Sequence, residues 1–507
     1  MRSRFSPGFR HPGEGRGPAT GRPRLDPGLC RGGSAGVGVL MLAAGLAGCT
    51  AGPDYHLPER AAINAPAAQG KFDAANDTSF SGADLPARWW RLYNDATLDG
   101  LIGEALAANT DLRAADANLR AATAVVLQAE AQRTVQTSVE GGVALARPYA
   151  TGLPLPGQVT YDATVNGTLP IDLAGRIRRA IEASQADAAA VAAVRDEVRV
   201  TVAATTTRAY LAACAANLRI AAAQRVIHIQ QQTYDATRRL EKGGRGTAFD
   251  TTRARTAVEQ SAAQVPALVV ARQAALYQLA TLLGRPPADY PRAVEACAAL
   301  PAIAGPLPVG DGAALLRRRP DVRAAERRLA AATARIGVAT ANLYPQVSFA
   351  GSLGFIGPLK GFGEGSDFNL NLGPLMSWSF PNRRVARAQI AQAGAAADAA
   401  LASFDGSVLG ALRETETALA AYARGREQVA ALRRARDSAA TATGQAGKLF
   451  RFGRGGFLDL LSAQATLANA EVSLAAAQAG VADSEAQLFL ALGGGWEAEA
   501  PAPAGQP

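Results

Sequence analysis

The chain is poor in the residues that build catalytic and metal sites. Its 507 residues include only three histidines, four cysteines and three methionines. His11, His56 and His228 are widely separated, and no HExxH, CxxC or Walker-type phosphate-binding motif occurs. The one GxSxG match, at 32–36, lacks the strand–turn–helix setting that a nucleophilic serine needs. We therefore expect no enzyme, no catalytic residue, no metal site and no bound cofactor.

The basic charge does not indicate nucleic-acid binding. The formal net charge is +9, but residues 1–48 hold seven arginines against Glu14 and Asp26, a net +5 that leaves +4 for the rest. That remainder has no block of Lys and Arg interleaved with aromatics. Nucleic acid is therefore not an expected partner.

An apolar run, 33–48, ends at Cys49. It follows a basic segment and is shorter than the roughly 20 apolar residues that span a bilayer. The letters LAGC at 46–49 resemble a bacterial lipobox, which predicts that 1–48 is a removed signal segment and that Cys49 carries a covalent lipid. The residue after the cysteine is Thr50 and not Asp, which in such lipoproteins favours transfer to the outer membrane over retention in the inner membrane. Of the other cysteines, Cys214 and Cys297 remain in the mature chain, and the sequence does not decide whether they form a disulfide.

The mature chain is a tandem duplication. DLRAADANLRAATA at 111–124 aligns with DVRAAERRLAAATA at 321–334, an offset of 210. RGTAFDTTRAR at 245–255 aligns with RGGFLDLLSAQ at 454–464, an offset of 209, and QLATLLG at 278–284 repeats at the same offset. Such a period exceeds that of solenoid repeats and predicts two copies of one unit.

Each copy predicts a helix, a β-hairpin and a long helical hairpin. The expected boundaries are an extended segment 49–96 after the lipidated cysteine, a first repeat 97–292, a linker 293–310, a second repeat 311–493 and a flexible tail 494–507. The first helices are expected at 97–134 and 311–342, the β-hairpins at about 136–170 and 346–380, and the helical hairpins at about 177–284 and 384–492. Each hairpin would join a long helix (177–241 or 384–450) to a return helix (249–284 or 457–492). A helix of about 65 residues is roughly 100 Å long, and its apolar spacing fits coiled-coil-like packing.

The two predicted β-hairpins have one apolar and one polar face. In 158–169 apolar and small residues alternate with Thr, Asp and Asn, and 347–355 and 368–380 alternate in the same way, with a weaker fourth strand near 139–145. Ten-residue alternation is typical of membrane β-strands, with Phe349, Leu370 and Trp378 facing lipid. Four strands cannot close a barrel, and open edges are not tolerated in lipid, so the chain must oligomerise. Three chains giving twelve strands is one solution.

The chain resembles the outer-membrane efflux channel family of the TolC and OprM type, in its NodT-like lipoprotein branch serving resistance-nodulation-division pumps. The resemblance rests on CTAGPDY (49–55), WWRLYNDATLDGLIGEALAAN (89–109), LPIDLAGRIRRA (169–180), the stretch 315–345, SWSF (377–380) and LLSAQATLANAE (460–471). It implies a homotrimer: a 12-stranded barrel in the outer membrane on a helical α-barrel that extends through the periplasm. The implied partners are a periplasmic adaptor, or membrane fusion protein, and an inner-membrane transporter, and the implied function is passive export of small molecules or drugs.

The turns of the two helical hairpins, KGGRGTAFD (242–250) and FGRGGFLD (452–459), are the candidate working ends. The resemblance places them at the periplasmic mouth, with Arg245, Asp250, Arg454 and Asp459 at the aperture and Ser462 where some relatives carry a second acid. The exposed glycines would admit the adaptor: Gly243, Gly244, Gly246, Gly453, Gly455 and Gly456. A purely structural role for each Asp, stabilising a helix dipole, is also open. Two alternative functions remain: a conduit for polypeptide secretion, and a structural lipoprotein rod without a pore.

Overall fold

The computed structural model describes residues 50–146, 149–150, 153–154, 157–297, 299–380 and 383–495. The predicted signal segment, Cys49 and most of the predicted tail lie outside these residues. The first repeat consists of α3 (Ala96–Ala108), α4 (Thr110–Ala131), β2 (Gln136–Ala146), β5 (Gln158–Ile171), α5 (Arg176–Lys242), α6 (Ala248–Ala262) and α7 (Val265–Leu282). The second consists of α9 (Gly312–Arg318), α10 (Pro320–Ala341), β7 (Gln346–Pro358), β8 (Phe368–Ser377), α11 (Arg383–Arg451) and α12 (Phe457–Ala491).

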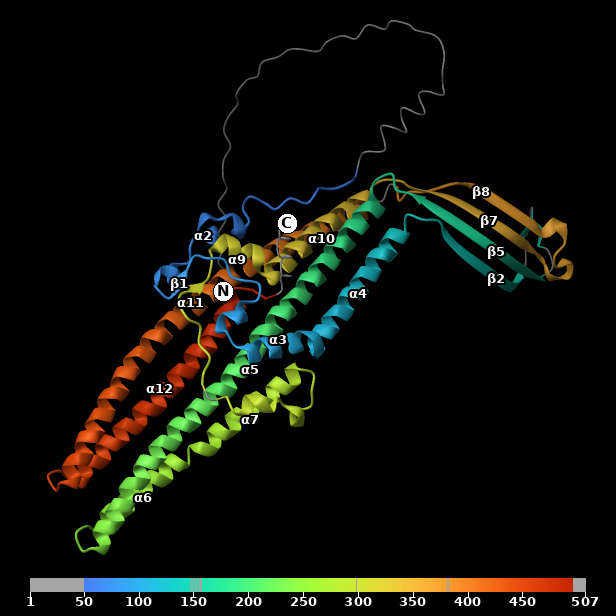
Figure 1. The fold of residues 1–507 in the computed structure, drawn as a ribbon. Coiled ribbons are helices and arrows are strands. Elements are labelled where there is room, and N and C mark those ends of the chain that lie inside the picture. The colour runs from blue at the N-terminus through green and yellow to red at the C-terminus, as the bar shows by residue number, and fades with distance from the viewer. Residues whose placement is uncertain are drawn as a thin grey trace, which may run out of the picture. The chain divides into compact units, whose positions relative to one another are not determined.

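The two long helices organise the packing. α5 has 67 residues and α11 has 69, so each is about 100 Å long. α5 packs along α4, α6, α7, α10 and α12, and α11 packs along α10 and α12 (Figure 1). By length and composition alone, Ala248–Leu282 and α11 could also cross a membrane, a test that the core helices of soluble proteins pass as well.

Three helices that the sequence predicts as continuous are interrupted. The predicted helix 97–134 breaks at Asn109, whose side chain caps α4 by accepting the N–H groups of Asp111 and Leu112 at 2.9 and 3.1 Å. The predicted helix 311–342 breaks at Arg319, because a residue before a proline is disfavoured in helical geometry and Arg319 has ψ of 120°. The first return helix, predicted at 249–284, breaks before Pro266, which lacks the N–H that a helix interior needs.

The segment predicted to be extended, 49–96, is instead folded against the helices. It contains η1 (Ala62–Asn64), α2 (Pro66–Gln69), η2 (Asp73–Asn76), β1 (Phe80–Ser81) and η3 (Trp89–Tyr93). Trp89 is fully buried and stacks on Phe489 of α12 with ring centroids 4.4 Å apart. Burial of such large rings stabilises this contact and orders the segment.

The linker predicted at 293–310 is also ordered. It includes most of α8 (Arg292–Glu295) and β6 (Leu307–Pro308), which pairs in parallel with β1. A disulfide joins Cys297 to Cys214 of α5, so the bridge left open by the sequence is present. Asn217, one turn further along α5, donates to the carbonyl oxygens of Glu295 and Cys297 at 3.0 and 3.1 Å. The linker is thus attached to α5 both covalently and by hydrogen bonds.

The four main strands form one antiparallel sheet in the order β2-β5-β7-β8. The central pair joins the two repeats, and the outer strands β2 and β8 are the sheet edges within the described chain. The register aligns an apolar row, Val139, Val165, Leu353 and Leu370, and a polar row, Ser138, Asn166, Ser352 and Asn371. β8 ends at Ser377, so Trp378 and Phe380, predicted to be in the strand, follow it and stack on each other at 4.9 Å.

Candidate functional site: the helical hairpin tips and the sheet

The turns at the two hairpin tips have the same backbone geometry. At the first tip, Arg245 N–H donates to the Leu240 oxygen at 2.9 Å and Gly244, with φ of 68°, donates to the Glu241 oxygen at 2.9 Å. This is a Schellman motif, which ends a helix with a residue in the left-handed conformation. At the second tip, Arg454 N–H donates to Leu449 at 2.9 Å and Gly453 has φ of 69°. Duplication has therefore preserved the turn as well as the helices.

The tip glycines differ in what they contribute. Gly244 and Gly453 supply the positive φ that the motif requires. A Cβ at Gly246 would lie 3.2 Å from Leu240 Cβ, and one at Gly455 would lie 2.9 Å from Leu449 Cβ, so these positions let the turn fold back onto the helix. A Cβ at Gly243 would meet only ordinary contacts.

Asp250 and Asp459 both lie in the first turn of a return helix. The Thr247 hydroxyl donates to Asp250 Oδ2 at 2.7 Å and accepts the Asp250 N–H at 3.1 Å. Asp459 Oδ2 accepts the Gly456 N–H at 3.2 Å. Each carboxylate thus supports a helix N-terminus, where the macrodipole favours negative charge.

Within the described part of one chain, no hydrogen bond or ion pair joins the predicted aperture residues to one another. Arg245 and Arg454 are exposed, and within the described part of the chain neither has an ion-pair partner. Exposed aromatic side chains, which the sequence analysis did not select, accompany them: Phe249 is 66% and Phe452 79% exposed. The sequence could have indicated these two aromatic residues, because both lie close to the glycines of the turns.

A hydrogen bond between α5 and α12 joins the two helical hairpins. Gln464 Nε2 donates to the Thr233 hydroxyl at 2.6 Å, and both side chains are buried. A cavity of about 600 Å³ lies close by, between α6 and α12, lined by Arg253, Ser462 and others. Gln464 was not predicted, although a glutamine among alanines and leucines of a buried helix face was visible in the sequence.

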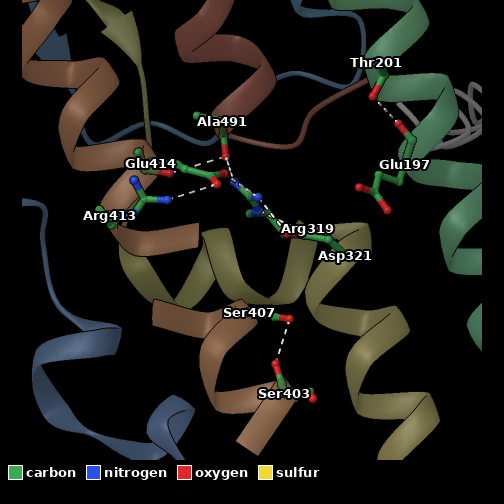
Figure 2. A network of polar contacts seen from close by, with 10 residues as sticks. Glu197, Thr201, Arg319, Asp321, Ser403, Ser407, Arg413, Glu414 and Ala491 are labelled. Atoms are coloured by element: carbon green, nitrogen blue, oxygen red, sulfur yellow. Dashed lines mark hydrogen bonds and ion pairs between the residues drawn. The ribbon is translucent and has the colours of Figure 1, made fainter. Parts of the chain in front are cut away.

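A second polar cluster lies at the break between α9 and α10 (Figure 2). Arg319 donates to both carboxylate oxygens of Asp321 at 2.9 and 2.7 Å, to Glu414 of α11 at 2.9 Å and to the Ala491 oxygen at the end of α12 at 2.8 Å. Burial lowers the pKa of the Arg319 guanidinium, but the bonds to Asp321 and Glu414 outweigh it, so the pKa is raised. Its neighbour Arg318 donates to the Leu492 oxygen at 2.8 Å. The two arginines therefore bind the C-terminal end of α12 to the start of α10.

The sheet presents opposite chemistry on its two faces. On one face, Val165, Leu353 and Leu370 are 50%, 47% and 69% exposed, and most other apolar side chains of this face are exposed too. The other face carries Ser, Thr and Asn side chains. Tyr161 is an exception on the apolar face: its ring packs on Phe362 at 4.6 Å and its hydroxyl donates to Asp367 at 3.0 Å. One face is thus suited to hydrocarbon and the other to water. Within the described residues, no group of His, Cys, Asp and Glu is arranged to hold a metal.

Long duplicated helical hairpins attached to a sheet with one apolar face define an outer-membrane channel of the efflux type. Residues 101–285 and 313–494 match the outer membrane efflux protein family, and the chain belongs to it. The family resemblance and the fold class predicted from the sequence are confirmed. The chain is an efflux conduit of the outer membrane.

Among known proteins it is similar to Nodulation protein T of Rhizobium leguminosarum bv. trifolii, with 29% identity over 468 residues, covering 90% of this chain and 97% of the relative. It is 28% identical over 474 residues to outer membrane protein OprJ of Pseudomonas aeruginosa, covering 91% and 96%. The solved outer-membrane channel OprN has 35% identity and a TM-score of 0.81, covering 88% of this chain and all of that one.

Proposed function

We propose that the chain is the outer-membrane component of a tripartite pump and forms a homotrimeric, passive channel for small molecules. The observation that carries this proposal is the four-stranded sheet with an apolar face and two edges, β2 and β8, that have no further strand paired to them within the described residues. Unpaired edge groups are costly in lipid, so the edges must pair with other copies. Three copies give an even, 12-stranded barrel whose polar rows line the lumen. The two matched segments support repeat boundaries at 97–292 and 311–493.

The proposed partners are a periplasmic adaptor at the hairpin tips and an inner-membrane resistance-nodulation-division transporter. The adaptor would contact the glycine turns around Gly244 and Gly453, where the backbone is exposed. A covalent lipid on Cys49 is the second proposed link to the outer membrane, and we propose that the protein has neither a catalytic residue nor a protein-bound cofactor.

Cross-linking and conductance test the channel. Detergent-purified protein should cross-link to a trimer and give discrete conductance steps in planar bilayers. Migration only as monomer or dimer would refute the trimer, and absence of conductance would favour a structural rod. A deletion strain should accumulate small toxic compounds; loss of polypeptide secretion instead would favour the secretion conduit.

We further propose that rings of Arg245, Asp250, Arg454 and Asp459 close the periplasmic mouth at rest. Threefold symmetry would place three copies of each residue around one axis, so one substitution changes three charges. Like carboxylates in a narrow ring repel one another, and arginines of neighbouring chains would offset this. Within the described part of one chain, Arg245 and Arg454 have no ion-pair partner, so both side chains are available for such contacts.

Single-channel recording distinguishes this gate from a helix-capping role. Asp459→Ala should reduce cation preference, and Arg454→Ala should loosen closure and raise conductance. Asp459→Asn is the matched variant, because its side-chain oxygen can still accept the Gly456 N–H while the charge is removed. If conductance and ion selectivity stay unchanged in all three variants, only the structural role of this turn remains.

A further inference from the structure

The residues that follow Cys49 are held against the junction between the sheet and the helices. The Ala51 N–H donates to the Ala174 oxygen at 2.9 Å. Arg178, in the first turn of α5, donates to the Thr50 hydroxyl at 3.0 Å. Ala174 lies in the short connection between the end of β5 at Ile171 and the start of α5. The segment 50–54 is therefore attached where the chain leaves the sheet.

Arg179 supplies most of this attachment. Its side chain is only 4% exposed and donates to the carbonyl oxygens of Ala51 and Gly52 at 3.2 and 3.4 Å. It also forms ion pairs with Asp54 at 2.6 Å and with Glu182 at 2.8 Å. Burying a guanidinium is unfavourable unless its donors are satisfied, and here the 50–54 segment provides three of the four acceptors. The arginine is thus matched to this segment.

Glycines allow the segment to approach the helices closely. Gly52 has φ of 84°, and a Cβ there would lie 2.4 Å from the Cα of Gly337 in α10. A Cβ at Gly337 would in turn lie 2.9 Å from the Ala51 oxygen and 2.7 Å from Arg179 Cγ. Gly175, with φ of 75°, leaves space for the Thr50 side chain, because a Cβ there would lie 2.5 Å from Thr50 Cγ2. Gly175 and Gly337 therefore shape one binding groove, and Gly52 lets the docked segment enter it closely.

We infer that Arg179, Gly175 and Gly337 form a docking groove for residues 50–54 that fixes where a lipid on Cys49 enters the membrane. The groove adjoins exposed apolar side chains at the end of β5, Leu169 and Ile171, and in the connection that follows it, Leu173. The proposed attachment residue, Cys49, directly precedes Thr50 in the sequence, and consecutive Cα atoms are about 3.8 Å apart. The attachment point of the lipid is therefore set by the position of Thr50. Its acyl chains would then lie beside the hydrocarbon-facing end of the sheet. Arg179 is a positioning residue, and the inference rests on the proposed lipidation of Cys49 and the proposed barrel.

Hydrogen–deuterium exchange of the full-length, detergent-purified protein tests the groove itself. We expect the Ala51 amide to be protected, and Arg179→Ala to speed its exchange at least tenfold. Gly337→Ala should do the same without changing charge, because the new methyl group displaces the Ala51 carbonyl. Arg176→Ala, a charge control in the same turn, and Gly100→Ala, at an open helical position, should leave protection intact. An unprotected Ala51 amide, or one unaffected by Arg179→Ala and Gly337→Ala, would overturn the groove.

Cross-linking from the lipid tests its placement. Cells would be fed a photoactivatable palmitate analogue, and cross-linked peptides of the purified protein mapped by mass spectrometry. Cross-links should concentrate on 158–173 and 346–358 in the parent and in Arg176→Ala, and should scatter in Arg179→Ala. A scattered pattern in the parent would overturn the positioning role. Failure to incorporate the analogue would instead refute lipidation, and amide protection, which needs no lipid, would still report on the groove.

Discussion

Glu485 of α12 gives the protein a pH dependence that a single substitution should remove. Its side chain is 4% exposed, and its Oε1 has no hydrogen-bond partner in the described structure. Burial raises the pKa of Glu485 to about 8, opposed by Arg426 of α11 and by the Ile303 N–H of the linker. Tyr93 of η3 and Tyr422 of α11 also face it, and burial followed by the Glu485 charge raises the pKa of each. The carboxyl group is therefore largely protonated at neutral pH.

The sign of the effect follows from the direction of this shift. The folded state holds the proton more tightly than the unfolded state, whose value is near 4.5. The contribution of Glu485 to stability is therefore greatest below about pH 4.5 and is lost as the pH rises towards 8. Each pH unit in this window costs up to about 1.4 kcal/mol, so the whole window costs at most about 5 kcal/mol. Glu485→Gln removes the titration and should flatten this part of the profile.

Thermal unfolding of purified protein between pH 5 and 8.5 measures the difference. At pH 8, Glu485→Gln should unfold several degrees above the parent, and near pH 5 the two should nearly coincide. Glu427→Gln is the matched control, because Glu427 is exposed on α11 and should leave the slope unchanged. The reasoning is wrong if Glu485→Gln keeps the parent's pH slope, or if it is less stable than the parent at pH 8.

Three further substitutions test other parts of the protein. Cys49→Ser should abolish palmitate labelling and leave an unprocessed precursor; labelling of the variant would refute the lipid site. Leu370→Arg, in the exposed apolar row of β8, should destabilise the membrane-inserted protein by roughly 2–4 kcal/mol, measured by urea unfolding in lipid vesicles, whereas Asn371→Arg on the opposite face should have little effect. Replacing Cys214 and Cys297 together by Ser should lower the free energy of unfolding by about 2–5 kcal/mol; chemical denaturation checks this, and an unchanged midpoint would contradict it.

Periodicity and duplication were sufficient to predict the long helices and the strands. Apolar and alanine residues recur through 177–241 and 384–450, and α5 and α11 begin and end within one residue of these bounds. Two-residue alternation identified β5 and β7, because the faces of a membrane strand differ in polarity along its whole length. The end of β8 was placed too late, since Trp378 and Phe380 continue the alternation beyond the last paired residue.

Features that depend on distant contacts were not predictable. The break at Asn109 requires that its side chain cap α4, and its amide also donates to the Leu282 oxygen, a residue 173 positions away. Cysteine count alone left the Cys214–Cys297 pairing open, because no local pattern brings α8 beside α5. The tip residues were found from the repeated Gly-Arg turn, but the sequence did not distinguish glycines that the Schellman turn requires, such as Gly244, from one that it does not, Gly243.

The disulfide between Cys214 and Cys297 also determines how the protein transmits mechanical force. The bond spans 83 positions, which include the C-terminal part of α5 and all of α6 and α7. Tension applied between the chain ends would pass through the two sulfur atoms and bypass α6, α7 and the part of α5 that follows Cys214. At about 3.4 Å per residue, roughly 280 Å of contour length is shielded in the oxidised protein and released after reduction. The second hairpin, α11 and α12, has no such bypass within the described chain and would extend under the same load.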